Sequence, residues 1–308
     1  MAAQLIQHRG PTGGRARVLA RVIGNDPRGS LRWLTIEIPR WVGAQPGQFA
    51  LLQTQRSCCF LARAFSVADE EKGAVSFLVD PVGQGTRELC ELGPGDAVWT
   101  LGPLGNGFDL DAMAGDSRPN PSGLGPGRSG RVLVVAGGAG IAPFPLFLSR
   151  LAEHDTARDV STEVVALAGF RDADQAKAAI PLEKAIARHE GMGLSWRLLV
   201  AAEDGSLGPP QKVTDLLERE VRPGDMVAAC GPDAMSAAVW RISSTVQGVR
   251  AWFSLEANMA CGVGSCHGCV IVLSNGSFAR VCRDGPVFPG EAVFADSSAL
   301  IDRQEKRA

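Results

Sequence analysis

The stretch from Ser254 to Val287, SLEANMACGVGSCHGCVIVLSNGSFARVCRDGPV, holds four of the eight cysteines in the chain. They are Cys261, Cys266, Cys269 and Cys282, with the spacing C-x4-C-x2-C-x12-C. The first three have the spacing of plant-type [2Fe–2S] proteins, in which a fourth cysteine follows further along the chain. Small residues separate the first three, namely Gly262, Gly264, Ser265 and Gly268. Such residues let the backbone fold closely around a cluster, so the stretch predicts a [2Fe–2S] site.

Two other uses of these cysteines stay open at this point. A structural zinc site usually shows two short Cys or His pairs, whereas this stretch has one C-x2-C, one C-x4-C and a separate Cys282. Disulfides or ordinary thiols are the other alternative, and disulfides require an oxidising compartment. His267 lies inside the loop, but four cysteines already satisfy a cluster. We therefore expect His267 to shape the surroundings of the cluster without binding it.

The composition is that of an ordinary globular protein. The chain has 308 residues, of which 45% are hydrophobic and 21% charged, and its net charge is −2. This length predicts two domains, or three if one is small, and the charge argues against a nucleic-acid surface. The first residues have no long apolar core, so no signal peptide is expected. The uncharged stretch between Arg131 and Arg150 is interpreted as a strand, a glycine turn and a buried helix, and no membrane span is predicted. We expect a cytoplasmic protein.

Residues 1–114 are predicted to form an antiparallel β-barrel or sandwich. Short β-prone segments separated by Gly and Pro turns are expected at 18–23, 31–38, 64–67, 75–79 and 97–101. Two motifs in this region are candidates for ligand binding. In Arg63-Ala64-Phe65-Ser66, the arginine can hold a phosphate and the next residues can flank a flat ring, although such residues are also common in a plain strand. In Gly83-Gln84-Gly85-Thr86, glycines before a helix can form an anion site, or only a turn.

Residues 115–130, GDSRPNPSGLGPGRSG, are rich in Gly, Pro and Ser and are predicted to be a flexible linker. Residues 131–250 then alternate between strand and helix, which predicts a doubly wound α/β domain. Its first strand runs into GGAGIAP at 137–143, which is a strand-to-helix turn but not the G-x-G-x-x-G fingerprint. Small or polar residues follow several strands and favour a nucleotide crevice at that edge. Residues 251–308 form the predicted cluster-binding module.

Taken together, these motifs resemble the ferredoxin–NADP reductase superfamily, and within it the electron-transfer subunits of class 1B dihydroorotate dehydrogenase. The resemblance covers nearly the whole chain. Its most specific segments are Leu101 to Phe108 (LGPLGNGF), Ser254 to Glu256 (SLE), Met259 to Gly262 (MACG), Arg280 to Cys282 (RVC) and Asp284 to Phe288 (DGPVF).

The resemblance implies three cofactors. FAD would lie in the barrel, with Arg63 on its pyrophosphate, Ala64, Phe65 and Ser66 beside the flavin, and Gly85 and Thr86 on phosphate at a helix N-terminus. NAD(H) would lie on the α/β domain, near Gly138, Gly140, Asp204 and Gly231. Cys261, Cys266, Cys269 and Cys282 would ligate the cluster. Ser66 and Cys230 are the candidates for shaping hydride transfer, and the alternative for Cys230 is a small buried apolar residue.

The chain departs from the family pattern in the barrel. Ala64 stands where the family commonly has proline, Val79-Asp80 stands where it often has Tyr-Arg, and the chain contains no tyrosine. These differences remove flavin and phosphate contacts. The choice between NAD and NADP depends on a cation near the ribose. Arg171 can serve that purpose, but Asp172 beside it would repel a 2′-phosphate, which favours NAD.

The predicted function is electron transfer between NAD⁺ and an FMN-containing catalytic dihydroorotate dehydrogenase subunit, through FAD and [2Fe–2S], in pyrimidine biosynthesis. The expected assembly is a heterotetramer with two copies of each subunit. An alternative keeps the fold but places the chain in a ferredoxin:NAD(P) oxidoreductase, a sulfide dehydrogenase or a hydrogenase complex. A third hypothesis is a redox-sensing or structural protein that keeps the fold without turnover.

Overall fold

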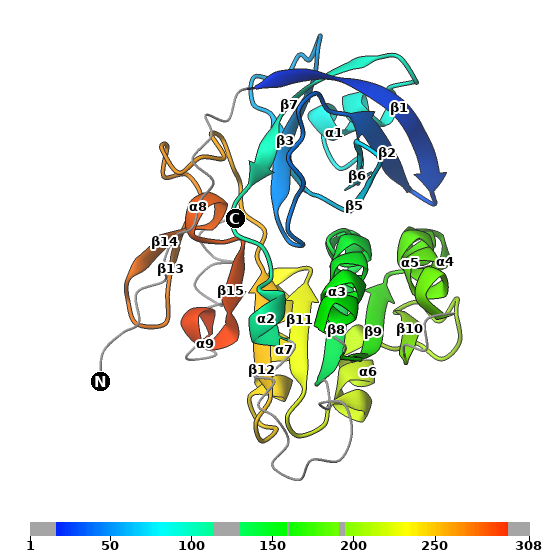
Figure 1. Ribbon diagram of the computed structural model, residues 1–308, viewed down its shortest axis with the longest axis vertical. Coiled ribbons are helices and arrows are strands. Elements are labelled where there is room, and N and C mark those ends of the chain that lie inside the picture. The colour runs from blue at the N-terminus through cyan, green and yellow to red at the C-terminus, as the bar shows by residue number, and fades with distance from the viewer. Residues whose placement is uncertain (1–16, 114–129, 159, 191–194, 295–308) are drawn as a thin grey trace.

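A computed structural model describes residues 17–113, 130–158, 160–190 and 195–294. Figure 1 shows an antiparallel β-domain at the top, an α/β domain below it and a small module with β13 and β14 at the side. This is the predicted fold class. Among the described residues, no helix is long and apolar enough to cross a membrane. The uncharged stretch between Arg131 and Arg150 forms a strand, a 3-10 turn and the first part of a buried helix, as predicted.

The N-terminal domain is one seven-stranded antiparallel sheet with the order β4-β3-β7-β1-β2-β6-β5. Its strands are β1 (Val18–Arg28), β2 (Leu31–Glu37), β3 (Phe49–Thr54), β4 (Arg63–Ser66), β5 (Asp69–Glu71), β6 (Ala74–Val79) and β7 (Ala97–Leu104). The order ends at β4 and β5, so the sheet is a half-barrel that hydrogen bonds do not close. Alternate residues such as Val22, Ile36 and Phe77 fill its interior. Two short helices accompany the sheet, α1 (Gln84–Cys90) and α2 (Leu110–Met113).

The α/β domain is built on a six-stranded sheet with the order β10-β9-β8-β11-β12-β15. The strands are β8 (Arg131–Gly137), β9 (Glu163–Phe170), β10 (Trp196–Ala202), β11 (Met226–Cys230), β12 (Arg250–Ser254) and β15 (Val287–Pro289). The first five run parallel and β15 is antiparallel to β12. The helical segments are η1 (Gly138–Ile141), α3 (Phe144–Arg158), α4 (Ala173–Ala176), η2 (Lys177–Ala179), α5 (Ile180–Glu190), α6 (Val213–Glu220) and α7 (Asp233–Ser243).

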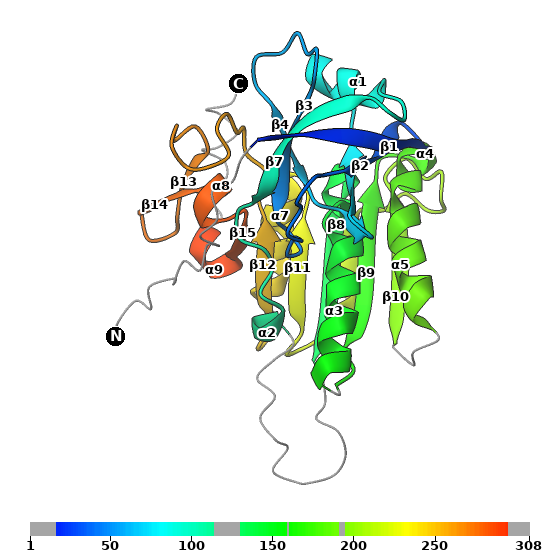
Figure 2. The same cartoon turned by 45° about the horizontal axis from the view of Figure 1, so that its top comes forward.

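Helices cover both faces of this sheet because successive residues of β8 point to opposite sides. Val132 and Val134 pack with the residues of α3 and α5, whereas Leu133 and Val135 pack with those of α6 and α7. Figure 2 shows α3 and α5 on one face of the sheet. The strand order reverses beside β8, so the carboxyl ends of β8 and β11 lie at the point where such sheets bind ligands.

The C-terminal module contains the β13 (Val270–Val272) and β14 (Phe278–Arg280) hairpin with helices α8 (Val281–Asp284) and α9 (Gly290–Val293). The predicted boundary at 250/251 lies at the first residue of β12, a strand that continues the parallel sheet. β15 returns from the module to pair with β12. The domain boundaries stay predictions. Of the predicted linker 115–130, only Gly130 lies within the described residues.

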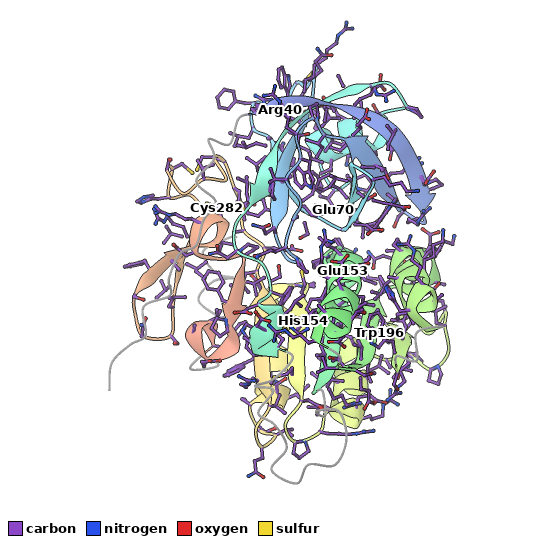
Figure 3. The ribbon with its side chains drawn as sticks, viewed as in Figure 1. Arg40, Glu70, Glu153, His154, Trp196 and Cys282 are labelled. Carbon is purple, nitrogen blue, oxygen red and sulfur yellow. The ribbon has the colours of Figure 1, made fainter. Side chains whose placement is uncertain are left out.

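The half-barrel packs directly on α3 of the α/β domain. The backbone N–H of Leu146 donates to the carbonyl of Ala68 at 2.8 Å, and Arg150 pairs with the Glu70 carboxylate at 2.7 Å. Figure 3 places Glu70 at the edge of the half-barrel that faces α3, on which Glu153 and His154 are labelled. Phe108, which follows β7, packs edge-on against Phe147 with ring centroids 5.4 Å apart. These contacts fix where β4 lies relative to the crevice of the α/β domain.

Candidate functional site

Three of the four clustered cysteines lie on the loop between β12 and β13, and the fourth lies in α8. Cys269 and Cys282 are buried, Cys261 is half-buried and Cys266 is exposed. Figure 3 labels Cys282 in the C-terminal module. The site thus has an inner pair of cysteines and an outer edge near solvent.

Backbone and side-chain contacts divide these cysteines into two pairs. The N–H of Cys266 donates to Sγ of Cys261 at 3.4 Å, and the N–H of Cys282 donates to Sγ of Cys269 at 3.4 Å. Within the described parts of the chain, no three His, Cys, Asp or Glu side chains are grouped so that they could hold a single metal ion. Two thiol pairs differ from a four-ligand zinc centre and fit two irons that each take two cysteines.

The backbone of the loop stabilises thiolate at one of these positions. Burial acts to raise the pKa of Cys261, but N–H groups of Cys266, Val263 and Ser265 donate to its sulfur and bring the pKa down to about 6. Burial, followed by the neighbouring Cys269 thiol, raises the pKa of Cys282 to about 12. Iron bound at this site would lower the pKa of Cys282 again, because the positive charge of a metal ion favours thiolate.

Glycine lets the cluster loop lie against the half-barrel. Gly262 has φ +66°, and a Cβ there would be 2.8 Å from Cδ1 of Leu51 on β3 and 3.0 Å from Cδ1 of Leu104 on β7. Gly264 has φ +84°, and a Cβ there would meet Arg283 at 2.9 Å. Arg280 donates to the carbonyl of Gly264 at 3.1 Å, which closes the loop over the hairpin. Side chains larger than hydrogen at Gly262 and Gly264 would therefore clash with neighbouring residues.

Asn106 connects the half-barrel to the cluster module. Its backbone N–H donates to the carbonyl of Gly285 at 2.6 Å, and its side-chain amide donates to the carbonyls of Arg283 at 3.0 Å and Asp284 at 3.2 Å. Sequence reasoning counted Leu101 to Phe108 among the segments that carry the family resemblance but gave Asn106 no role. Its signal was the LGPLGNGF segment, in which a carboxamide lies among glycines that allow close backbone contact.

The structure brings the two predicted phosphate-binding motifs of the half-barrel together. A Cβ at Gly85, in the first turn of α1, would lie 3.1 Å from Cζ of Arg63. Thr86 uses its hydroxyl within the same turn, since it accepts from the N–H of Gly83 at 3.0 Å and donates to the Gly83 carbonyl at 2.9 Å. The first N–H groups of a helix have no intrahelical acceptor. A guanidinium beside such a turn is a combination that suits a pyrophosphate.

Ala64, Phe65 and Ser66 are half-buried on β4, the edge strand of the half-barrel. Ala64 is the register partner of Leu51 on β3, the same leucine that contacts Gly262 of the cluster loop. The predicted flavin strand and the cluster loop therefore both adjoin β3 at Leu51.

Glycines at the ends of β8 and β11 shape the predicted NAD(H) crevice. Gly138 has φ +54°, and nothing lies within 4 Å of a Cβ built there, so this position faces open space. Gly140 is different, because its Cβ would lie 2.4 Å from the carbonyl oxygen of Cys230. Gly231 has φ +155°, and its Cβ would lie 3.0 Å from the N atom of Gly137. Close backbone packing next to an open position fits the approach of a dinucleotide.

Asp204 lies in the exposed loop after β10. Hydrogen bonds from the Ser206 hydroxyl and backbone N–H lower the pKa of Asp204. The Ser206 hydroxyl in turn accepts from the N–H of Ala173 at 2.7 Å, so the loops after β9 and β10 are tied together. Asp172 caps α4 by accepting from the N–H of Gln175 at 2.8 Å, and Arg171 is exposed beside it. A carboxylate next to the exposed arginine agrees with the expected preference for NAD.

Cys230 ends β11 and is 3% exposed. Burial and the nearby Glu256 carboxylate raise the pKa of Cys230, and a hydrogen bond with Ser254 opposes this. Ser254 is the register partner of Cys230 on β12. Sequence reasoning noted the SLE segment but assigned no role to Ser254 or Glu256. Only the pairing of β11 with β12 shows that they accompany Cys230. The other hydride-step candidate, Ser66, lies on the half-barrel.

Comparisons with known proteins agree with this arrangement. Residues 256–294 match the iron-sulfur cluster binding domain of dihydroorotate dehydrogenase B, and residues 134–241 match the oxidoreductase NAD-binding domain. The dihydroorotate dehydrogenase B (NAD(+)) electron transfer subunit of Caldanaerobacter subterraneus subsp. tengcongensis is 35% identical over 91% of this chain and 99% of its own length. The protein of the same name from Geobacillus kaustophilus is 36% identical over 81% of this chain and 87% of its own length.

Solved structures extend the likeness to the whole chain. A chain of the NADH-dependent reduced ferredoxin-NADP oxidoreductase has a TM-score of 0.69 at 28% identity and covers 96% of this chain and 95% of its own. Ferredoxin-NADP+ reductase from Plasmodium falciparum shares the fold at 13% identity, with a TM-score of 0.54 over 74% of this chain and 90% of its own. From the identity and coverage of the curated relatives, the chain belongs to the family of dihydroorotate dehydrogenase B (NAD(+)) electron transfer subunits.

Proposed function

We propose that this chain is the electron-transfer subunit of an NAD-dependent dihydroorotate dehydrogenase and carries electrons between the FMN of a catalytic partner and NAD⁺. The observation that carries the proposal is the division of Cys261, Cys266, Cys269 and Cys282 into two thiol pairs on a loop that packs on the half-barrel. FAD, [2Fe–2S] and NAD(H) are its cofactors. A bound flavin exchanges electron pairs with nicotinamide and single electrons with a cluster. Orotate chemistry belongs to the partner.

In the half-barrel, Arg63 binds the FAD pyrophosphate together with Gly85 in the first turn of α1. Thr86 holds that turn through its hydrogen bonds to Gly83. Ala64, Phe65 and Ser66 are the residues of β4 that we assign to the flavin. This assignment is supported by the contact between the Arg63 guanidinium and the position of the Gly85 side chain, which joins two motifs about twenty residues apart in sequence.

In the α/β domain, Gly138 gives NAD(H) its space, while Gly140 and Gly231 let the ends of β8 and β11 pack closely beneath it. We assign Asp204, in the loop after β10, to the same NAD(H) site. Cys230 is a neutral thiol, since burial and the Glu256 carboxylate raise its pKa, and with Ser66 it would shape the nicotinamide site. A neutral surface that excludes water at this point favours hydride transfer over side reactions with solvent.

The partner docks on the exposed edge of the cluster module. Cys266 and His267 are exposed there, and two apolar side chains lie on the same module, Val263 at 46% and Phe278 at 74% exposure. An apolar edge beside a cluster suits a protein interface that excludes water. The catalytic subunit binds this edge, in a heterotetramer with two copies of each subunit. A cytoplasmic location is proposed with it, because the chain has eight free thiols in its described residues.

Copurification with the catalytic subunit tests the proposal. The chain, purified with its partner, should carry FAD and FMN in equal amounts, with two irons for each FAD, and should reduce NAD⁺ with dihydroorotate. Cys266→Ser should abolish that activity and lower the iron content, whereas Cys58→Ser, an exposed cysteine in another loop, should change neither. If FAD and iron are present but no FMN subunit and no dihydroorotate activity are found, the assignment to this enzyme is wrong.

A second candidate is a reductase subunit that serves a ferredoxin. The 28% identity and 0.69 TM-score to the NADH-dependent reduced ferredoxin-NADP oxidoreductase favour it. NADH-dependent reduction of added ferredoxin, compared with that of the FMN partner, separates the two candidates.

A further inference from the structure

Phe60 is the most exposed of the large hydrophobic side chains in the described residues, at 94%. It lies in the loop between β3 and β4, three residues before Arg63. An aromatic side chain that burial would stabilise is left in solvent here. An exposed aromatic side chain on a loop with a fixed backbone is available to contact a ligand or a partner.

Hydrogen bonds anchor the backbone on both sides of Phe60. The amide of Gln53 on β3 donates to the carbonyl of Cys59 at 2.6 Å. The N–H of Cys58 donates to the Glu88 carboxylate of α1 at 3.3 Å. Arg63 donates to the carbonyl of Leu61. Phe60 therefore projects from a loop whose neighbours are fixed.

The same contacts place Phe60 beside the proposed phosphate site. Arg63 contacts both the loop, at Leu61, and the first turn of α1, at Gly85. Figure 2 shows the loop between β3 and β4 next to α1 at the top of the molecule. A ligand held at its pyrophosphate by Arg63 would therefore have this loop and α1 among its neighbours.

FAD differs from FMN by its adenosine half, which needs a flat apolar surface to lie on. Aromatic rings provide such a surface, since every base has a π-face. The chain has no tyrosine, and Phe60 is an exposed aromatic side chain on the loop that Arg63 contacts. We propose that Phe60 stacks on the adenine of FAD and makes the site selective for FAD over FMN. This inference rests on the proposed FAD site in the half-barrel.

Flavin binding to the flavin-free full-length chain tests the proposal. Phe60→Ala should weaken FAD binding about tenfold or more, because base stacking on an aromatic ring has that size, and should leave FMN binding unchanged. Phe60→Trp should restore FAD affinity. The matched control is Phe278→Ala, which removes an aromatic side chain of 74% exposure from the cluster module. It should leave the affinity for both flavins unchanged. Fluorescence titration measures the affinities, and circular dichroism confirms that each variant is folded.

Three outcomes would overturn the proposal. They are equal FAD affinity in Phe60→Ala and the wild type, equal losses for FAD and FMN, or a loss confined to binding of the catalytic partner. The last outcome would make Phe60 an interface residue. Failure of the wild type itself to bind FAD is a separate result, because it removes the proposed FAD site and not only the role of Phe60.

Discussion

Two glycines of the cluster module have nearly the same backbone conformation but different surroundings. Gly262 has φ +66° and a Cβ there would contact Leu51 and Leu104 at 2.8 and 3.0 Å, whereas Gly276 has φ +79° and open space within 4 Å. Both glycines avoid the cost of left-handed backbone in other residues. Only Gly262 is also needed for the contact between the cluster loop and the half-barrel.

We predict that Gly262→Ala lowers iron and sulfide content per chain to less than half. The new methyl group must push the loop off β3 and β7, which costs about 1–3 kcal/mol beyond the backbone term. Gly276→Ala should lower stability by about 1 kcal/mol and leave the iron content unchanged. Equal iron content in the two variants would show that the loop does not need this contact. Iron analysis and visible absorbance measure the effect.

A second prediction concerns thiol reactivity and pH. Burial and Glu256 raise the pKa of Cys230, so its thiolate fraction in the folded chain is lower than that of an ordinary thiol at every pH. Alkylation requires the thiolate, and we expect Cys230 to stay unmodified by iodoacetamide up to about pH 9, near the ordinary thiol pKa. Exposed Cys58 should be modified readily under the same conditions. Peptide mass spectrometry after timed labelling gives both rates. Comparable rates would mean that the end of β11 is open to solvent.

At the scale of elements, the turn from β8 into η1 contains one glycine that packing requires and one that faces open space. Gly138 and Gly140 are two residues apart, but a Cβ meets open space at Gly138 and the carbonyl of Cys230, at 2.4 Å, at Gly140. The first position is therefore available to a ligand, and the second is filled by the neighbouring strand.

We expect the two alanine variants of this turn to fail in different ways. Gly140→Ala should lower the unfolding free energy by roughly 1–3 kcal/mol, because backbone atoms of β11 must move. Gly138→Ala should cost only about 1 kcal/mol but raise the KM for NADH about tenfold, since its methyl group enters the nucleotide space. Thermal unfolding and steady-state reduction of an artificial acceptor separate the effects. An unchanged KM in Gly138→Ala would place the nucleotide elsewhere.

Element boundaries were largely predictable where strong patterns exist. The strands expected at 31–38 and 75–79 are β2 (Leu31–Glu37) and β6 (Ala74–Val79), which agree within one residue, and the GGAGIAP turn follows a buried strand as expected. The expected antiparallel barrel is present as a half-barrel, since the sheet ends at β4 and β5 without pairing them. Sequence patterns report alternation along a strand but not which edge strands remain unpaired.

At the scale of the whole molecule, the half-barrel and the α/β domain are joined by a half-buried ion pair. Arg150 on α3 is 32% exposed and Glu70 is 11% exposed, with 2.7 Å between Nη2 and Oε2. Arg150 also pairs with Glu153 at 2.9 Å. This contact orients the domain that binds FAD relative to the one that binds NAD(H).

Arg150→Met is therefore expected to slow electron transfer from NADH to FAD several-fold without loss of FAD or iron. Removal of the pair lowers domain stability by roughly 1 kcal/mol and loosens the geometry that hydride transfer requires. Arg21→Met removes an exposed pair with Glu37 inside the half-barrel, with side chains 63% and 57% exposed, and should have no effect on that rate. Stopped-flow reduction of FAD compares the variants. Equal rates would show that the ion pair does not set the domain geometry.

The sequence by itself determined the family, the fold class, the three cofactors and the electron-transfer function, and the comparisons confirm these predictions. Local patterns suffice for the fold class and the cluster, because cysteine spacing, glycine turns and strand–helix alternation are each encoded within a few residues. FAD, NAD(H) and the electron-transfer function were implied by the family resemblance that these motifs carry. The individual site residues and the domain boundaries stay predictions.

Only the tertiary structure decided which distant residues meet. It paired Cys261 with Cys266 and Cys269 with Cys282, set Arg63 beside Gly85, and placed Ser254 and Glu256 next to Cys230. It also connected Asn106 to the cluster module 177 residues away. Such contacts depend on strand order and register, which arise from packing across the whole chain and leave no periodic signal in the sequence.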